Sequence, residues 1–300
     1  MLSLKKSLTA FSWNIKMLLK SPRFYMGLLM GFGVCFFLTE KVISYSRILG
    51  TDLQVFEPFI WCFGDSDSIL FASLALLLPL SRLPRLDAPA SYLIFRTGRT
   101  NWILGQVLTV IAVSFIYTFA LLFFSSSLTL GLSFFQNRWS DTATVMSYVP
   151  PHLQTTLVMI RRTIKQFLPW QSVFMVFSLI LEYMLFLSLL NLAFSLLFGK
   201  KAGIQAVMGV SFLCCFLSPE RFVNWLSLPQ QGKYIANLIS AWVSPLQQAT
   251  YSMHSNGYDR LPSLRTSHML FLLINSLFIL ACFLFSKRIP FIFRLGDDAE

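Results

Sequence analysis

Residues 170–198 read WQSVFMVFSLILEYMLFLSLLNLAFSLLF, and Glu182 is the one charged residue among them. The hydrocarbon core of a bilayer is about 30 Å thick, so a helix needs about 20 apolar residues to cross it. This stretch therefore predicts a transmembrane helix. The whole chain has the same character, since 55% of its residues are hydrophobic, 12% are charged and its mean hydropathy is +0.65. Soluble domains carry about twice that share of charged residues.

Five further stretches are long and apolar, namely 24–43, 59–83, 101–124, 202–218 and 267–286. The second of them is the least regular, because its apolar core is short and because Asp65 and Asp67 lie within it. Together the six stretches predict an all-α polytopic membrane protein with six transmembrane helices. We expect one membrane domain, which divides into an interfacial helix over 1–22, a bundle over 24–286 and a tail over 287–300.

Basic residues are unevenly distributed over the segments that flank these stretches. Fourteen lysines and arginines fall in the N-terminal segment, the second and fourth connections and the tail, and ten fall in the longer loops on the other side. Since cytoplasmic loops carry an excess of lysine and arginine, we expect both termini in the cytoplasm. The net charge of +11 follows mostly from this asymmetry, so it does not indicate a nucleic-acid surface.

Motifs of enzymes and metal sites are missing from the sequence. Residues 198–201 (FGKK) lack the spacing and the hydroxyl residue of a phosphate-binding loop, and neither His-Glu-x-x-His nor Gly-x-Ser-x-Gly occurs. Asp65-Ser66-Asp67 has the form of a metal-binding pair, but no other ligand clusters with it. The five cysteines show neither metal spacing nor an obvious disulfide pair. We therefore expect no catalytic residue, no metal site and no cofactor bound by this chain.

The N-terminal segment, 4–20, has the pattern of an amphipathic helix. Apolar residues at intervals of four and three form one face, which consists of Leu4, Leu8, Phe11, Ile15 and Leu18. A basic helix that carries a tryptophan lies in the headgroup plane of a membrane. We interpret it as an elbow helix that also contacts a cytoplasmic partner, the alternative being a helix that only anchors the chain. The residues expected to take part are Phe11, Trp13, Lys16, Lys20 and Arg23.

The connection 81–100 has the signals of a short helix. Asp87 is a suitable N-cap, Pro89 lies in the first turn, where proline is tolerated, and Gly98 is a suitable stop. We interpret a helix over 87–99 as a docking element for a soluble protein, the alternative being a basic loop that lies on anionic lipid. The residues expected to make the contact are Arg85, Asp87, Tyr92, Phe95, Arg96 and Arg99.

Glu182 lies roughly midway along the fourth stretch. Carboxylates inside a membrane are unfavourable and indicate a function, such as a proton relay or a contact with a polar substrate. A neutral Glu182 that is hydrogen bonded to Tyr183, Asn191 or a neighbouring helix is the alternative. The sequence points to no basic partner for it. Glu182 and Asn191 are therefore the candidate intramembrane polar residues.

The segment 219–266 follows the fifth stretch and is not very polar. Aromatic and aliphatic residues recur at helical spacing over 234–242, so we predict an outer hairpin of two short amphipathic helices before the last span. In the first stretch, Gly27 and Gly31 form a GxxxG pair. We attribute this pair to the general frequency of glycine in membrane helices.

The order of these features resembles the permeases of ABC transporter type-2 exporters. The features are a basic amphipathic helix that ends in Lys20-Ser21-Pro22-Arg23, a cytoplasmic helix after the second span, a basic turn at 199–203 (GKKAG) and an outer hairpin. The resemblance is architectural and covers essentially the whole chain. It implies a bacterial plasma-membrane subunit that pairs with a second permease, identical or homologous, and with two cytoplasmic ATPase subunits. ATP and Mg would bind in the partner ATPase. The helix over 87–99 would receive the movement of the ATPase, and the helix over 4–20 would pack beside the ATPase.

The resemblance therefore implies export of an amphipathic compound, such as a peptide, an antibiotic or a lipid-like molecule, by a chain that is not itself an enzyme. Two other classes stay open. One is an ion-coupled secondary transporter that uses Glu182, although we find no internal repeat between 24–135 and 170–286. The other is a membrane scaffold or sensor subunit that transports nothing. Membrane lipid is the remaining expected partner.

Overall fold

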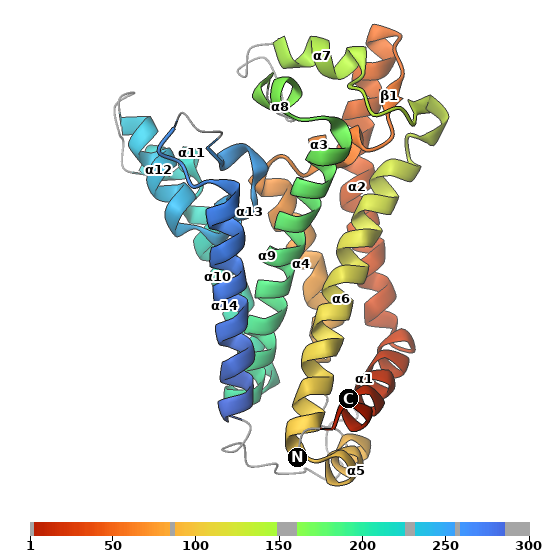
Figure 1. Cartoon of the computed structure of the whole chain (residues 1–300), viewed down its shortest axis with the longest axis vertical. Helices are drawn as coiled ribbons and strands as arrows, with labels where there is room; N and C mark the ends of the chain where they lie inside the picture. Colours follow the sequence, from red (N-terminus) through yellow and green to blue (C-terminus); the bar gives the residue numbers. More distant parts are fainter. Residues whose placement is uncertain (1–2, 85–87, 149–160, 226–231, 256–258, 286–300) are drawn as a thin grey trace.

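The computed structural model describes residues 3–84, 88–148, 161–225, 232–255 and 259–285. Long helices run along the length of the molecule, and shorter elements lie at both ends (Figure 1). One end, the α5 end, carries α1 (Leu4–Leu19) and α5 (Ala88–Thr97). The opposite end, the α7 end, carries α3 (Glu57–Cys62), α7 (Asp141–Tyr148) and α8 (Arg161–Gln166).

Four helices are long and apolar enough to cross a membrane, namely α2 (Pro22–Leu49), α6 (Arg99–Ser127), α9 (Pro169–Phe198) and α14 (Leu264–Phe285). They correspond to the first, third, fourth and sixth apolar stretches, and each begins one to three residues earlier than predicted. Their length and composition make the chain an all-α, multi-pass membrane protein. α14 ends at the α5 end of the molecule, which also carries α1 (Figure 1).

The second and fifth stretches form shorter helices, α4 (Ser66–Leu80) and α10 (Lys200–Phe216), of 15 and 17 residues. Both pack against α9 within the bundle (Figure 1). At a rise of 1.5 Å per residue, they measure roughly 23 and 26 Å, less than the thickness of a bilayer core.

The predicted stretch 59–83 is not one helix. α3 ends at Cys62 and α4 begins at Ser66, with Asp65 as the N-cap in an extended conformation. Aspartate is among the residues preferred at this position. The acidic residues that made the stretch irregular therefore mark the start of a second helix.

The packing of α2 depends on two glycines. A Cβ atom at Gly27 would lie 2.6 Å from Cδ of Pro79 in α4, and a Cβ atom at Gly31 would lie 2.9 Å from the hydroxyl of Tyr117 in α6. That hydroxyl donates a hydrogen bond to the carbonyl of Ala72 at 2.8 Å. The GxxxG pair thus permits close contact with two neighbouring helices. Attributing it to the frequency of glycine was wrong.

Short elements close the α7 end. β1 (Leu53–Gln54) pairs in parallel with β2 (Ser133–Phe134), which follows the 3-10 turn η1 (Leu130–Leu132). Trp139 Nε1 donates to the carbonyl of Phe167 at 2.8 Å. These contacts join the segments that follow α2 and α6 to the start of α9.

The segment after α10 forms α11 (Pro219–Trp225), α12 (Gly232–Val243), α13 (Pro245–Ala249) and the 3-10 turn η2 (Tyr251–Met253). α11 and α12 pack against each other, and α13 packs against α4 and α9. Cyan and blue in Figure 1, these elements lie beside the bundle toward the α7 end.

Candidate functional site

The candidate site lies at the α5 end, where α1 packs on the beginning of α6. The face of α1 toward α6 consists of Ser7, Ala10 and Asn14, which are all buried. A Cβ atom at Gly105 of α6 would lie 2.6 Å from Cβ of Ala10 and 3.1 Å from the backbone nitrogen of Phe11. Glycine at this position is therefore required for the close approach of the two helices.

Hydrogen bonds between polar side chains stabilise the contact between α1 and α6. Asn14 Nδ2 donates to Thr109 Oγ1 at 3.3 Å, and Asn14 Oδ1 accepts from Gln106 Nε2 at 3.3 Å. At the start of the contact, the backbone N–H of Ser3 donates to Asn101 Oδ1 at 2.8 Å. Interhelical hydrogen bonds of this kind stabilise membrane proteins by about 0.6 kcal/mol each on average.

Asn101 also holds the end of α5. Its Nδ2 donates to the carbonyl of Thr97 at 2.7 Å. Gly98, with φ +86°, makes the turn from α5 into α6 in a conformation that residues with a side chain rarely adopt. One amide side chain thus joins α1, α5 and α6, and we call this arrangement the Asn101 junction.

The apolar face predicted for α1 lies largely away from the bundle. Leu4 and Leu8 are 70% and 47% exposed, Phe11 and Ile15 are half-buried, and Leu18 is buried. The helix is therefore held by its small polar face, and Leu4 and Leu8 are left available to lipid or to another protein.

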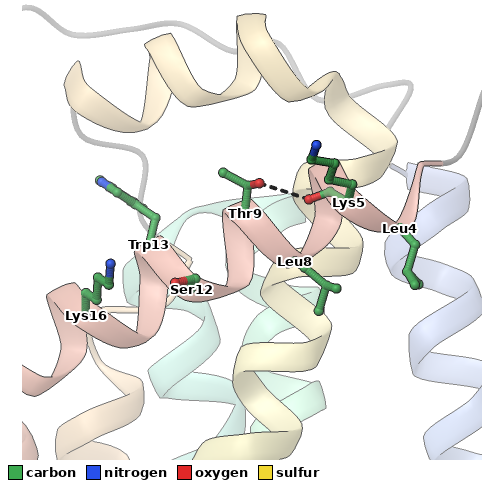
Figure 2. Close-up of a pocket in the computed structure, with 7 residues that line it drawn as sticks. All are labelled: Leu4, Lys5, Leu8, Thr9, Ser12, Trp13 and Lys16. Carbon is green, nitrogen blue, oxygen red and sulfur yellow. Dashed lines mark hydrogen bonds between the residues drawn. The ribbon is translucent and has the colours of Figure 1, made fainter.

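An open surface along α1 is lined by residues of this helix alone. Figure 2 shows Leu4 and Leu8 on one side of the helix axis, and Lys5, Thr9 and Trp13 on the other. Ser12 and Lys16 complete the lining. The elbow residues Trp13 and Lys16 therefore belong to a surface that combines apolar, hydroxyl and basic groups.

The two remaining elbow residues, Lys20 and Arg23, lie at the turn from α1 into α2 and are exposed. Arg23 Nη1 donates to the hydroxyl of Ser81 at 3.4 Å, which links the start of α2 to the end of α4. A basic group is thus fixed where the polypeptide enters the bundle.

α5 is the helix expected over 87–99, and it has two different faces. Ala90, Ile94 and Thr97 are buried, and the helix packs against α1 and α6. Tyr92 and Phe95 are 70% and 83% exposed. Large aromatic side chains that point away from the protein at a helix end are typical of an interaction surface.

Basic residues were predicted beside these aromatics. Arg96 and Arg99 are exposed, so they border the same surface. Arg85 and Asp87 lie outside the residues that the structure describes. The expected docking surface therefore comprises Tyr92, Phe95, Arg96 and Arg99.

Asn191 is 1% exposed and fixes the end of α4. Its Nδ2 donates to the carbonyls of Leu80 and Leu83 at 3.2 and 3.4 Å. In a continuing helix, the carbonyl of Leu80 would accept an N–H from residue 84, which is a proline and has none. Asn191 supplies a donor at this helix end and so stabilises the end of α4.

Glu182 has a partner that the sequence did not indicate. Its Oε2 lies 2.8 Å from Nδ1 of His268 at the start of α14, and its side chain is 19% exposed. The backbone carbonyl of Glu182 also accepts a hydrogen bond from Asn275 Nδ2 at 3.4 Å. The expectation that this carboxylate lacks a basic partner was wrong. No sequence pattern indicated His268, because the two residues are 86 positions apart.

A second histidine lies near this pair. His254 Nε2 is 2.9 Å from the hydroxyl of Ser267, and its Nδ1 is 3.1 Å from the carbonyl of Thr250. Burial lowers the pKa of His254 to about 4, so this ring is neutral at neutral pH. His254 therefore contacts Ser267 and Thr250 as a neutral hydrogen-bonding group.

Glu57 is a buried acid that the sequence patterns did not single out. It is fully buried at the α7 end, where its carboxylate accepts from the N–H of Ser140 at 2.7 Å, from the Ser140 hydroxyl at 2.6 Å and from the N–H of Gln54 at 3.2 Å. Burial raises the pKa of Glu57 to about 7, although these hydrogen bonds lower it. The carboxyl thus joins α3 to the start of α7.

The arrangement offers exposed surfaces and polar contacts between helices. Among the residues that the structure describes, no group of three or more histidine, cysteine, aspartate or glutamate side chains could hold a metal ion. No family model, no curated protein and no solved structure matches the chain.

Proposed function

We propose that this chain is the membrane-embedded permease subunit of an ATP-driven ABC exporter in a bacterial plasma membrane. Its substrate would be an amphipathic compound such as a peptide, an antibiotic or a lipid-like molecule. α4 and α10 would complete six membrane spans together with the four longer helices. α11 and α12 would form the outer hairpin, and the α5 end would face the cytoplasm with both termini.

The observation that carries this proposal is the Asn101 junction. An exporter driven by a separate ATPase needs a surface that receives the ATPase and a rigid connection from it to a spanning helix. α5 presents Tyr92 and Phe95 at one end of the bundle. Asn101 ties the end of α5 to α1 and to the first turn of α6. A displacement of α5 would therefore be transmitted to both helices.

The charge distribution supports the same orientation. Of the fourteen basic residues that the sequence assigns to the cytoplasmic side, ten belong to described segments at the α5 end, which agrees with the excess expected in cytoplasmic loops. The sequence contains no phosphate-binding loop, so ATP and Mg would bind in the partner ATPase and hydrolysis would occur there. A second permease, identical or homologous, would complete the assembly.

The test is purification of the tagged chain from its host in mild detergent, followed by mass spectrometry of the proteins that accompany it. A stoichiometric P-loop ATPase is expected with the wild type, and a second permease would identify a mixed dimer. The variant Arg96→Glu/Arg99→Glu should lose the ATPase and transport while remaining folded. The control Arg138→Glu/Lys165→Glu reverses two exposed charges at the α7 end and should keep both. A wild-type chain that purifies without any ATPase would overturn the proposal.

The pair Glu182–His268 favours a second candidate, an ion-coupled transporter. A carboxylate that contacts an imidazole between two spanning helices has the composition of a proton-binding site. In this mechanism, transport would follow the proton gradient rather than ATP. A third possibility, a scaffold or sensor subunit, would be favoured if the assembled complex showed no substrate-dependent ATPase stimulation.

A further inference from the structure

A polar pocket lies where α4 begins, between that helix end and the segment from α11 to η2. Its volume is about 280 Å³. Asp65 and Asp67 line it from the start of α4, Arg221 lines it from α11, and Gln247 and Thr250 line it from α13 and the residue after it. Three separate parts of the chain thus bring polar groups together next to an apolar bundle.

The charges of this pocket do not balance. Arg221 Nη2 lies 3.3 Å from Oδ2 of Asp67, and Arg221 Nη1 donates to the carbonyl of Cys215 at 3.0 Å. The ion pair leaves Asp65 without a basic partner among the described residues. Burial and the neighbouring Asp67 raise the pKa of this carboxyl, although hydrogen bonds from the first N–H groups of α4 lower it. A carboxylate has about four acceptor sites, so Asp65 has capacity for further donors.

Gln247 gives an independent indication of a ligand. Its side chain is 2% exposed and belongs to the pocket wall, and its Nε2 has no hydrogen-bond partner among the residues that the structure describes. A buried amide donor without an acceptor is unfavourable, and each such case in a native protein requires an explanation. An acceptor oxygen on a bound molecule would supply the missing partner.

The elements around the pocket carry apolar side chains that point away from the protein. Phe212 and Phe216 of α10 are 63% and 55% exposed, and Ile239 and Trp242 of α12 are 41% and 46% exposed. Tryptophan is enriched at the level of lipid head groups. The pocket is therefore placed where a head group meets protein, beside a surface suited to acyl chains.

We propose that this pocket binds a zwitterionic group that combines a primary ammonium with an oxyanion, as phosphoethanolamine does. The ammonium donates to Asp65, and the oxyanion accepts from Gln247 and from the guanidinium of Arg221, a group well matched to phosphate. The group belongs to an aminophospholipid of the surrounding membrane or to a water-soluble molecule. Binding at this pocket does not depend on whether the chain is a permease.

The experiment compares the thermal unfolding midpoint of the full chain in nanodiscs of phosphatidylethanolamine and of phosphatidylcholine with identical acyl chains. The two lipids have the same net charge, but the choline head group has no N–H to donate. In phosphatidylcholine discs, the water-soluble probe glycerophosphoethanolamine is then added, with glycerophosphocholine as its control. We expect the ethanolamine head group to raise the midpoint by several degrees. A rise with the lipid alone identifies the membrane as the source, and a rise with the soluble probe identifies the free head group as sufficient.

Asp65→Asn should abolish the difference between the lipids. Asparagine is as good an N-cap as aspartate, so α4 should still start normally. Asp52→Asn changes an exposed acid outside the pocket and should keep the wild-type response. Equal midpoints in both lipids together with no response to the soluble probe would overturn the proposal, and so would a full response in Asp65→Asn.

If Asp65→Asn does not fold, the variant Gln247→Met provides a second test of the pocket. Methionine has a similar shape and no N–H, so it removes the unpaired donor from the pocket wall. Without ligand its unfolding midpoint should be higher than that of the wild type, whereas its response to the ethanolamine head group should fall. A purely structural role of Gln247 would leave that response unchanged.

Discussion

His268 Nδ1 lies 2.8 Å from Oε2 of Glu182, and this contact joins the start of α14 to the middle of α9. The two side chains are 29% and 19% exposed, so both are shielded from solvent without being fully enclosed. A carboxylate and an imidazole in this position either pair two helices or carry a proton. The two roles make different predictions for transport.

Replacing Glu182 with glutamine should leave ATP-dependent transport within about threefold of the wild type, a change smaller than 1.4 kcal/mol in the barrier. The amide retains a hydrogen-bonding group opposite His268 but cannot take up or release a proton. The measurement is uptake into inverted vesicles with ATP and with an imposed pH gradient. Glu40→Gln, which changes an exposed acid on α2, serves as the control. Loss of transport in Glu182→Gln alone, together with insensitivity to ATP in the wild type, would favour the ion-coupled mechanism.

Asn101→Ala should detach α1 and α5 from each other while leaving the bundle intact. The variant removes the acceptor of the Ser3 N–H and the donor to the Thr97 carbonyl. We expect faster hydrogen exchange in α1 and at the end of α5, and a loss of roughly 1–2 kcal/mol in stability. Thr100→Ala changes an exposed residue one position earlier and should exchange like the wild type. Unchanged protection of α1 in Asn101→Ala would contradict the role assigned to the junction.

The long helices could be predicted from sequence because lipid imposes a simple rule on them. Apolar runs of about 20 residues must be helical in a bilayer. The ends of α6, α9 and α14 accordingly fall within three residues of the predicted limits, whereas α2 runs six residues beyond its predicted end at 43. The break at 63–65 was not predicted, because an aspartate within an apolar run indicates either a polar site or an N-cap. Backbone geometry decides between the two.

The contacts of the candidate site were harder to predict because they join residues far apart in sequence. Glu182 and His268 are 86 positions apart, and Glu57 and Ser140 are 83 apart, so no spacing pattern connects them. The α1 contact did leave a signal, since Ser7, Ala10 and Asn14 recur at helical spacing. The leucines of α1 form the more conspicuous stripe, so the sequence pattern favoured the opposite face of the helix. Large apolar residues mark the face toward lipid, whereas small and polar ones mark the face toward protein.

Gly203→Ala should destabilise the contact between α9 and α10. A Cβ atom at Gly203 would lie 2.5 Å from the backbone carbonyl oxygen of Asn191 and would also overlap the hydroxyl of Ser195. Moving α10 to relieve this overlap should lower stability by about 1–3 kcal/mol. Gly209→Ala is the matched control on the same helix, because a Cβ atom at Gly209 would have no neighbour within 4 Å among the described residues and alanine is a better helix former. The measurement is the thermal unfolding midpoint in detergent, and equal midpoints for the two variants would contradict the close packing at Gly203.

Glu57 should make the α7 end pH-dependent. Burial raises the pKa of this carboxyl from 4.5 to about 7, so the folded protein keeps the proton at pH values where the unfolded chain has lost it. Its contribution to stability is therefore fully present below about pH 4.5 and is lost as the pH rises through about 7. At about 1.4 kcal/mol per pKa unit, the rise corresponds to roughly 3 kcal/mol.

Hydrogen exchange of β2 and α7, corrected for the intrinsic pH dependence of exchange, measures this effect between about pH 5 and pH 8. Protection in the wild type should fall as the pH rises. Glu57→Gln should give a flat profile, because its amide oxygen still accepts the N–H of Ser140 but does not ionise. Glu40→Gln should keep the wild-type profile. A Glu57→Gln profile that still falls with pH would contradict the assignment of the effect to Glu57.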